Sequence, residues 1–520
     1  MASQLPADCL REIFRYVEQN SRRIHDLRSC LLVNRIWCDT TAPILWKNPI
    51  GINWENEDTE NLFDCYHPKS NEFWERFART IFSCLPFESR ELIKKNNIRL
   101  NIRIFDITTF NYVNFVQYLS YRIILRCIGA ILVDNIGYYE NILENEIWKM
   151  FMDKNSAIKY LEPTYISIYY FPGGITCLQD LAELECSTNV STKFYFDLAQ
   201  FCRNIQRMSI EICESDINDN PGLLSLIELQ NGLKELRLSS ENRTFNKLGE
   251  VLIKQADTLT SLYFINFICI PIGSLNQLVN IKKIYVNFPY GYYFRPLNFI
   301  NLPRIEILNI QGGNGNNYDD LSLFKKYSQI IEKTQGTIRE LFVDIDEWPE
   351  VEGDIIHFIK TLIEYCPMLE SARIWFVDGY LEIFEELLIS CAHLKKLMIE
   401  STSVTGFWNA TDVRPLFKIL ANKTNNLNDL TFVGIINFSS EDLIEFLESW
   451  RGKKKLYLAF SHNSNLTRQH RDIFETYKLE GVLKGWKILN DDDVGNNRTH
   501  EDDDMESDTP SENVMFDIYY

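Results

Sequence analysis

The sequence predicts an α/β protein in which a short helical module precedes a solenoid of stacked strand–turn–helix repeats. Two observations lead to this prediction. From about residue 175 onward, one apolar pattern recurs with a period of roughly 27 residues, which is typical of repeat proteins. Residues 1–48 instead carry apolar residues at helical spacing. With 520 residues and 45% hydrophobic content, the chain is long enough to form several packed units.

The first helical segment begins at Leu5-Pro6. Proline suits the first turn of a helix because its missing N–H would have no partner there. Four apolar residues then follow at positions i, i+3, i+4 and i+7, namely Leu10, Ile13, Phe14 and Val17. This spacing predicts one apolar face on a short helix.

Two further helices are predicted before residue 48. We expect Asp26 to cap the second helix, and Asn34 to cap the third, which carries Trp37. Three helices in about 45 residues bury little surface, so their apolar side chains need a partner or a neighbouring domain. Periodicity alone leaves two interpretations open: a docking module, or a helical cap that covers the end of a larger domain.

The repeat consists of an apolar residue, two others, an apolar residue, one other and a third apolar residue. The series starts at Leu181/Leu184/Cys186 and ends with a weaker pair, Leu456/Leu458. We expect buried side chains at the central positions, such as Leu236, Leu308, Leu397 and Leu430. One repeat cannot bury its own apolar side, so the repeats must stack, with the strands inside and the helices outside.

Segments between the triplets are expected to be helical, as in residues 355–365, 381–390 and 416–421. Ser439 and Asp442 form a plausible capping pair before another helix. Ahead of the regular repeats, residues 73–85 and 89–96 read as helices, whereas residues 98–102 alternate like a strand. We therefore expect degenerate early repeats in this part of the chain.

The segments LPADCLREIFRYV, DLRSCLLVNRIW and the following LW resemble the F-box motif, and the triplets resemble the helix-containing class of leucine-rich repeats. The segments SCLPFESRELIKKNNI, FNYVNFVQYLS and DNPGLLSLIELQNGLKELRL are similar to a large family of F-box proteins in mycorrhizal fungi. The resemblance implies that three helices insert into a Skp-family adaptor, which bridges to a cullin–RING ligase. By position, the implied adaptor contacts are Leu5, Pro6, Leu10, Ile13, Phe14, Leu31, Val33 and Trp37.

The predicted organisation has four parts. Residues 1–48 form the F-box, and residues 49–175 form a spacer with degenerate leucine-rich repeats. Residues 176–490 form a leucine-rich-repeat solenoid, or horseshoe. Residues 491–520 hold eleven acidic residues and one arginine, and this composition predicts a disordered tail.

A target protein is expected on the concave face of the solenoid. In each strand, the residue between two buried positions points the other way. Across successive repeats this gives Arg237, Tyr263, Tyr285, Asn309, Phe342, Arg373, Met398, Thr431 and Tyr457, with Trp375 two residues beyond Arg373. Tyrosine, tryptophan and arginine are enriched at binding hot spots. The predicted contacts are Tyr263, Tyr285, Phe342, Arg373, Trp375 and Met398, although aromatic residues also simply suit strands.

Composition argues against several other classes of function. The net charge of −19 argues against a general nucleic-acid-binding surface. The thirteen cysteines contain no CxxC pair, and Cys186 and Cys202 fall at apolar positions, as expected for reduced core residues of an intracellular protein. His462 and His470 match no metal-binding spacing, and we expect them in a solvent-facing loop. No metal, cofactor or membrane is implied, and the expected location is cytoplasmic or nuclear.

The favoured function is the substrate receptor of a Skp–cullin–F-box ubiquitin ligase, with no catalytic residue of its own. The repeats would hold a target protein of unknown identity. One rival is an F-box and leucine-rich-repeat binding scaffold without degradation activity. The other is an enzyme hidden in residues 51–175, which would require perturbed titratable side chains converging in a deep pocket.

Overall fold

The computed structural model describes residues 5–18, 24–51, 71–102, 108–133, 137–153, 157–163, 171–213, 219–241, 243–293, 300–314, 322–343, 352–377, 379–401, 411–424, 426–462 and 464–490. These residues fall into two compact units. The first unit takes residues 5–213 and 220–233, and the second takes residue 219 and residues 234–490. The predicted acidic tail, residues 491–520, lies outside the described residues.

The first unit opens with three helices, α1 (Ala7–Glu18), α2 (Ile24–Cys30) and α3 (Arg35–Leu45). As predicted, Asn34 caps α3, because its side chain accepts a 3.0 Å hydrogen bond from the N–H of Trp37. The predicted cap at Asp26 is wrong. Helix α2 begins two residues earlier, so position 26 lies inside the helix.

The rest of the first unit alternates helices with four short parallel strands, ordered β1-β2-β3-β4. Its elements are α4 (Asn71–Ser83), α5 (Phe87–Lys95), the 3-10 helix η3 (Tyr112–Phe115), β1 (Tyr118–Ser120), α6 (Tyr121–Ile131), α7 (Gly137–Asp153), β2 (Tyr160–Glu162), α8 (Gly174–Leu178), β3 (Glu183–Ser187), α9 (Thr192–Phe201), β4 (Arg207–Glu211) and α10 (Pro221–Glu228). Helices α4 and α5 confirm the two helices predicted there. The strand predicted at residues 98–102 is wrong, since only Leu100 forms an isolated antiparallel bridge, with Leu132.

Strand–helix alternation therefore begins at β1, inside the predicted spacer. The boundaries predicted at residues 48 and 175 do not coincide with the division between the two units, which falls near residue 233.

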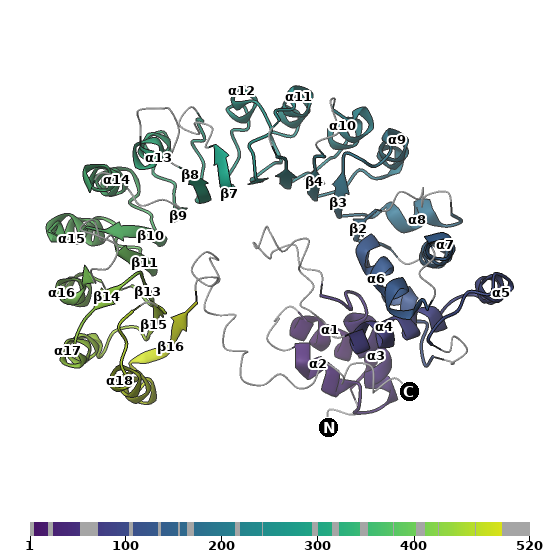
Figure 1. Ribbon diagram of the computed structural model, residues 1–520, viewed down its shortest axis with the longest axis horizontal. Helices are drawn as coiled ribbons and strands as arrows, with labels where there is room; N and C mark the ends of the chain where they lie inside the picture. Colours follow the sequence, from purple (N-terminus) through teal and green to yellow (C-terminus); the bar gives the residue numbers. More distant parts are fainter. Residues whose placement is uncertain are drawn as a thin grey trace. The chain divides into compact units, whose positions relative to one another are not determined.

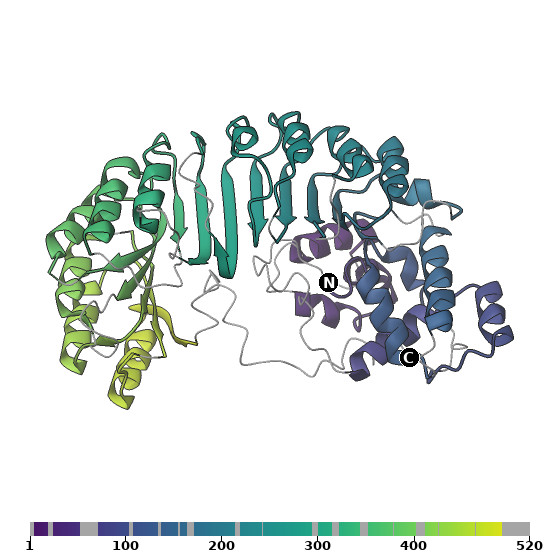
Figure 2. The same ribbon diagram turned by 45° about the horizontal axis from the view of Figure 1, so that its top comes forward.

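The second unit is a run of parallel strands ordered β5-β6-β7-β8-β9-β10-β11-β13-β15-β16, with a separate small pair, β12 and β14. Its elements are β5 (Glu235–Ser239), α11 (Asn246–Ile253), β6 (Ser261–Ile265), α12 (Ile272–Leu275), β7 (Lys283–Tyr293), β8 (Ile307–Asn314), α13 (Leu323–Ile331), β9 (Glu340–Val343), α14 (Glu352–Tyr365), β10 (Ser371–Phe376), α15 (Leu381–Ser390), β11 (Lys396–Ser401), β12 (Thr411–Asp412), α16 (Arg414–Lys423), β13 (Asp429–Val433), β14 (Ile436–Asn437), α17 (Ser440–Trp450), β15 (Leu456–Ser461), α18 (Arg468–Leu479) and β16 (Leu483–Leu489). Within this unit, the strands line one side and the helices line the other (Figure 1, Figure 2).

The core of the second unit is an in-register column of the predicted apolar residues. Leu236 pairs with Leu262, Leu262 with Ile284, and Ile284 with Leu308. The four central leucines predicted to be buried, Leu236, Leu308, Leu397 and Leu430, are all buried. In the first unit, Cys186 and Cys202 are buried core residues as predicted, and burial raises the pKa of the Cys186 thiol to about 12. The repeat pattern thus defines the interior.

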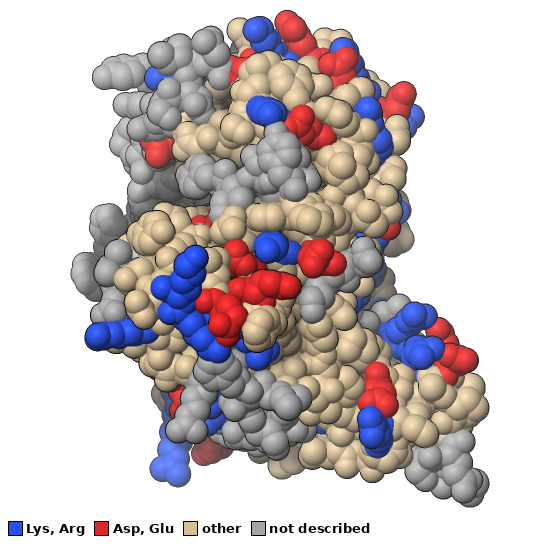
Figure 3. All heavy atoms as spheres, turned by 90° about the vertical axis from the view of Figure 1, so that its right-hand side faces the viewer, with Lys and Arg blue, Asp and Glu red and all other residues tan. Residues whose placement is uncertain are grey.

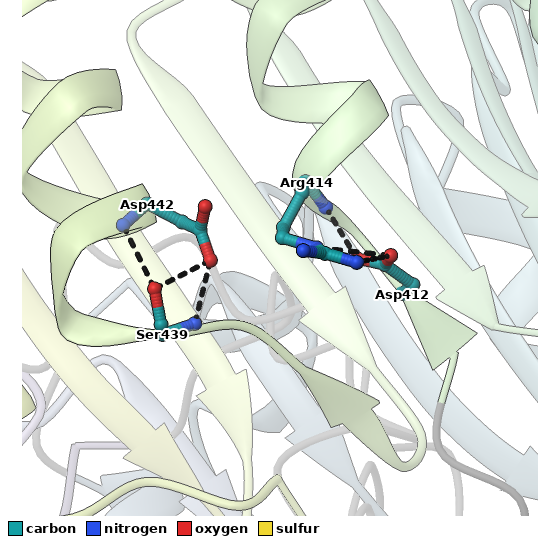
Figure 4. A network of polar contacts seen from close by, with 4 residues as sticks. All are labelled: Asp412, Arg414, Ser439 and Asp442. Atoms are coloured by element: carbon teal, nitrogen blue, oxygen red, sulfur yellow. Dashed lines mark hydrogen bonds and ion pairs between the residues drawn. The ribbon is translucent and has the colours of Figure 1, made fainter.

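The helices of the second unit agree closely with the helical segments predicted from the sequence. Helix α15 has the predicted bounds, and α14 and α16 contain the predicted segments. At the start of α17, the Asp442 N–H donates to the Ser439 hydroxyl (3.1 Å), and the Asp442 carboxylate accepts from the Ser439 N–H (2.8 Å). This reciprocal capping box, drawn in Figure 4, satisfies N–H groups that the first helical turn leaves unpaired.

Figure 4 also shows the start of the preceding helix, α16. There Arg414 turns its guanidinium back to both carboxylate oxygens of Asp412, with N···O distances of 2.5–3.0 Å. This contact lowers the pKa of Asp412 below its ordinary value.

Charged residues next to the strand starts pair between neighbouring repeats. Lys282 lies 2.7 Å from Glu306, and Arg339 lies 3.0 Å from Glu370. On its other side, Glu370 forms an ion pair with Lys395. Such exposed pairs each contribute at most about 1 kcal/mol to stability. The sign of the charge at this position nevertheless alternates from one repeat to the next, from Lys282 to Lys395.

The prediction that His462 and His470 both face the solvent is wrong for His470. His462 is exposed, but His470 is buried in the first turn of α18. Its Nδ1 accepts a 3.0 Å hydrogen bond from the N–H of Thr467, and its ring packs edge-on against Phe438. His470 therefore closes a capping box as a glutamate would in other helices.

The buried column predicts that two leucine-to-alanine substitutions differ greatly in their effect on the free energy of unfolding. Leu430→Ala removes a fully buried side chain and should lower the free energy of unfolding by about 2–5 kcal/mol. Leu479→Ala changes a side chain that is 87% exposed, and should alter it by less than about 0.5 kcal/mol. Urea denaturation followed by circular dichroism measures both values. Equal values for the two variants would contradict the assignment of Leu430 to the core.

Candidate functional site

The eight predicted adaptor contacts divide into buried and accessible residues. Leu10 and Phe14 of α1 are buried, as is Leu31, which follows α2. Trp37 is half-buried, and its ring meets that of Phe14 edge-on at a centroid distance of 5.2 Å. These four residues hold the three helices together, so they would contribute to binding by fixing the shape of the module.

The other four predicted contacts, Leu5, Pro6, Ile13 and Val33, are exposed. Ile13 is 46% exposed and Val33 is 51% exposed. Three more large side chains are exposed: Tyr16 on α1, Leu32 in the turn after α2, and Ile36 at the start of α3. The F-box resemblance did not imply these three as contacts. We call these seven residues the N-terminal apolar surface. Exposed apolar groups in such number are typical of a protein-binding site.

The three helices are joined to the rest of the first unit through Trp46. This side chain is fully buried, and it packs against Tyr112 at 4.5 Å and stacks on Phe77 at 5.8 Å between ring centroids. The N–H of Gln117 donates a 2.9 Å hydrogen bond to the carbonyl of Lys47. The module therefore packs against its own unit, as a helical cap would, and Ile13 and Val33 stay exposed.

In the second unit, strand register brings the predicted target-binding residues into one row. Tyr263 pairs with Tyr285, Tyr285 with Asn309, and Asn309 with Phe342. The Tyr263 and Tyr285 rings are parallel, with centroids 4.4 Å apart. The Arg237 guanidinium lies over the Tyr263 ring at 4.6 Å, at one end of this stack.

The other end of the row repeats this arrangement. The Arg373 guanidinium lies 5.2 Å from the Phe342 ring centroid and forms a 2.8 Å ion pair with Glu400. Arg237 has a carboxylate neighbour too, because Glu235 lies 3.7 Å away. Each cation is thus stacked on a ring and neutralised, an arrangement that stabilises a buried charge.

Most of the predicted target-binding residues are buried within the chain. Tyr285 and Met398 are half-buried, whereas Tyr263, Phe342, Arg373 and Trp375 are buried. Trp375 reaches the outer layer, where it meets Phe324 of α13 edge-on at 5.0 Å. The row is therefore a self-packed ladder of rings and cations, and its accessible members are Tyr285 and Met398.

Asn309 is the short polar side chain between the rings of this ladder. It is only 3% exposed, and its side-chain carbonyl oxygen has no hydrogen-bond partner among the described residues. A buried polar atom without a partner costs about 1–3 kcal/mol. Sequence reasoning placed Asn309 in the row but left it out of the predicted contacts, because a lone asparagine in a strand carries no signal of its hydrogen bonding.

A second group of polar residues lies on the strands of the first unit. Glu162 accepts a hydrogen bond from the Ser120 hydroxyl and lies 2.9 Å from Arg122. Arg122 is also 3.8 Å from Glu185, which accepts a 2.6 Å hydrogen bond from Tyr160. Burial, and then the nearby Glu185 carboxylate, raise the pKa of Glu162 to about 7.

The carboxylates of this cluster do not line the cavity that adjoins it. A cavity nearby is lined mainly by apolar residues, among them Ile81, Leu119 and Phe151. Its lining includes Ser120, but neither Glu162 nor Glu185 is among the described residues that line it. The described residues contain no group of histidine, cysteine or carboxylate side chains placed to hold a metal ion.

The surface drawn in Figure 3 mixes both signs of charge, with acidic and basic side chains lying next to one another among a larger area of uncharged residues. Among the helices that the structure describes, none is long and apolar enough to cross a membrane.

Comparisons with known proteins add little to this description. No protein-family model matches the chain. No curated protein matches it either. Among solved structures, the chain is similar to a leucine-rich repeat-containing protein from Legionella pneumophila, with 10% sequence identity and a TM-score of 0.31. The match covers 58% of this chain and 88% of that one. At this level of similarity, the fold and the function must be argued from the chain itself.

The unpaired oxygen of Asn309 predicts that an apolar replacement is stabilising. Asn309→Leu keeps the branched shape of the side chain, although it is larger, and removes the buried polar atom, so the free energy of unfolding should rise by about 1 kcal/mol. Urea denaturation measures the change, and Thr431→Val, another buried polar residue of the same row, serves as the control. A clear loss of stability in Asn309→Leu would show that the oxygen has a partner.

The environment of Glu162 predicts a pH-dependent stability. The folded state holds the pKa near 7, above the ordinary value of 4.5, so it binds more protons than the unfolded state between these values. The stabilisation is therefore present below about pH 4.5 and is lost as the pH rises through about 7. Unfolding measured from pH 4.5 to 8 should show this decline, which Glu162→Gln removes and the exposed control Glu88→Gln retains. An identical decline in Glu162→Gln would contradict the prediction.

Proposed function

We propose that this chain is the non-catalytic substrate receptor of a Skp–cullin–F-box ubiquitin ligase. The observation that supports this most is the N-terminal apolar surface. Of the eight contacts that the F-box resemblance implies, four are exposed, Leu5, Pro6, Ile13 and Val33, although three of these are apolar residues that would usually be buried. A partner with a complementary apolar surface is the simplest reason for a chain to keep them there.

Burial of this surface against a Skp-family adaptor would supply the binding free energy. Each exposed aliphatic side chain that becomes fully buried contributes about 1.5–3 kcal/mol before the cost of association. The buried residues Leu10, Phe14 and Leu31 would keep the helices in one arrangement, so little order would be lost on binding.

The second part of the proposed function is target binding by the second unit. Its row of rings, with Tyr285 and Met398 accessible, is the candidate surface. A receptor of this kind works by proximity. It raises the effective concentration of the target at a ubiquitin-charged conjugating enzyme held by the same complex, and it needs no catalytic group of its own.

Two charged substitutions on the N-terminal apolar surface test the adaptor interface. Ile13→Asp combined with Val33→Asp should reduce co-purification of a co-expressed Skp-family adaptor more than tenfold, because two carboxylates would have to be desolvated in an apolar interface. Both positions are exposed, so the fold and its melting temperature should be retained. Leu479→Asp, at the exposed last residue of α18, is the matched control and should bind like the unmodified chain.

Undiminished adaptor binding by the double variant would refute the assignment of this surface. If the unmodified chain binds the adaptor but never recruits a cullin, the chain is a binding scaffold without degradation activity.

A further inference from the structure

We propose that the ladder around Asn309 recognises an arginine side chain in an extended segment of the target. This inference rests on the proposed function, because it names the chemistry of the target that the second unit would hold. It is carried by the order of groups along the ladder and by the unpaired oxygen at its centre.

The ladder already contains two cation-binding positions. From β5 to β10 an arginine stands at each end and rings stand on both sides of one asparagine: Arg237, Tyr263, Tyr285, Asn309, Phe342 and Arg373. At each end a guanidinium carbon lies over a ring, 4.6 Å from the centroid of Tyr263 and 5.2 Å from that of Phe342. Neighbouring members are one strand apart, and the strand spacing of about 4.8 Å is close to a stacking distance.

The central layer differs from all the others. Tyr285 and Phe342 flank β8 on its two sides, so they stand two strand spacings apart, about 10 Å. The residue between them is Asn309, whose side chain is shorter than the rings and arginines of the other layers. Its carbonyl oxygen accepts no hydrogen bond within the described part of the chain. A guanidinium between the two rings would complete the stack and donate to this oxygen.

Charge also favours a cationic ligand. Arg237 and Arg373 are matched by Glu235 and Glu400 within the ladder, so these four side chains carry no net charge. The whole chain has a net charge of −19, which would attract a basic segment over a distance. Tyr285 is the half-exposed ring of the central layer, whereas Phe342 is buried, so the ligand would approach from the Tyr285 side.

The test uses the full chain and a defined probe, the peptide acetyl-Gly-Ser-Arg-Ser-Gly-amide, observed by saturation-transfer difference NMR. A second peptide carries citrulline, which has nearly the same shape as arginine but no charge. We expect the arginine peptide to bind at least fivefold more tightly than the citrulline peptide. Asn309→Leu should weaken the arginine peptide at least fivefold, because it removes the acceptor without loss of stability.

Asn309→Asp keeps an acceptor and adds a negative charge, so it should strengthen binding of the arginine peptide at least threefold. Thr431→Val, in the same row but four strands of the sheet away from Asn309, is the matched control and should leave the affinity unchanged. Unchanged affinity in Asn309→Leu would overturn the proposal, since the peptide would then bind elsewhere, for example at the acidic residues of 491–520. Equal binding of the two peptides would also overturn it.

Adaptor co-purification with the same variants separates this inference from the proposed function. Asn309→Leu should retain the adaptor. Loss of the peptide signal with the adaptor retained supports the proposal, whereas an unmodified chain that binds the arginine peptide but no adaptor would overturn only the ligase assignment.

Discussion

A strand-and-helix repeat has one apolar side that it cannot cover alone, and the rest of the structure depends on this constraint. The repeats must stack, and parallel pairing sets the register at which they do so. Once Leu236, Leu262 and Ile284 are aligned as a buried column, the residues one position along each strand are aligned too. The same pairing that forms the core therefore places Tyr263 against Tyr285 on the opposite face. Core and candidate binding row are two consequences of one register.

Much of the fold could be predicted because these signals are local and repeated. The apolar triplets identified the strands, and the Ser439–Asp442 pair identified a helix start. The failures have local causes as well. Residues 98–102 alternate like a strand, but only Leu100 finds a bridge partner, and alternation cannot show whether a neighbouring strand exists. The predicted series ended at Leu456/Leu458, although Leu483, Trp486 and Ile488 of the last strand, β16, have the same apolar spacing and β16 pairs with β15.

For the candidate sites, the sequence predicted which face of a strand each residue lies on, but not which groups surround its side chain. Strand alternation correctly placed Phe342 and Arg373 on one face, yet it could not show that they stack on each other and become buried. Motif position alone did not separate Ile13, which is exposed, from Phe14, which anchors the helices. The isolated acceptor of Asn309 and the raised pKa of Glu162 arise from neighbours on other strands, which no single segment of sequence reveals.

The ion pairs between neighbouring repeats make some changes in the number of repeats slightly more favourable than others. In a solenoid each repeat contacts only its neighbours, so removal of a whole repeat brings the two flanking repeats into contact. Glu370 stands between Arg339 and Lys395 and forms an ion pair with each. Deletion of the one repeat that carries Glu370 would place the two basic residues side by side, replacing two attractive pairs with a repulsive one. Removal of two consecutive repeats would conserve the alternation of sign elsewhere in such a ladder, so length changes in this part of the chain should favour even steps.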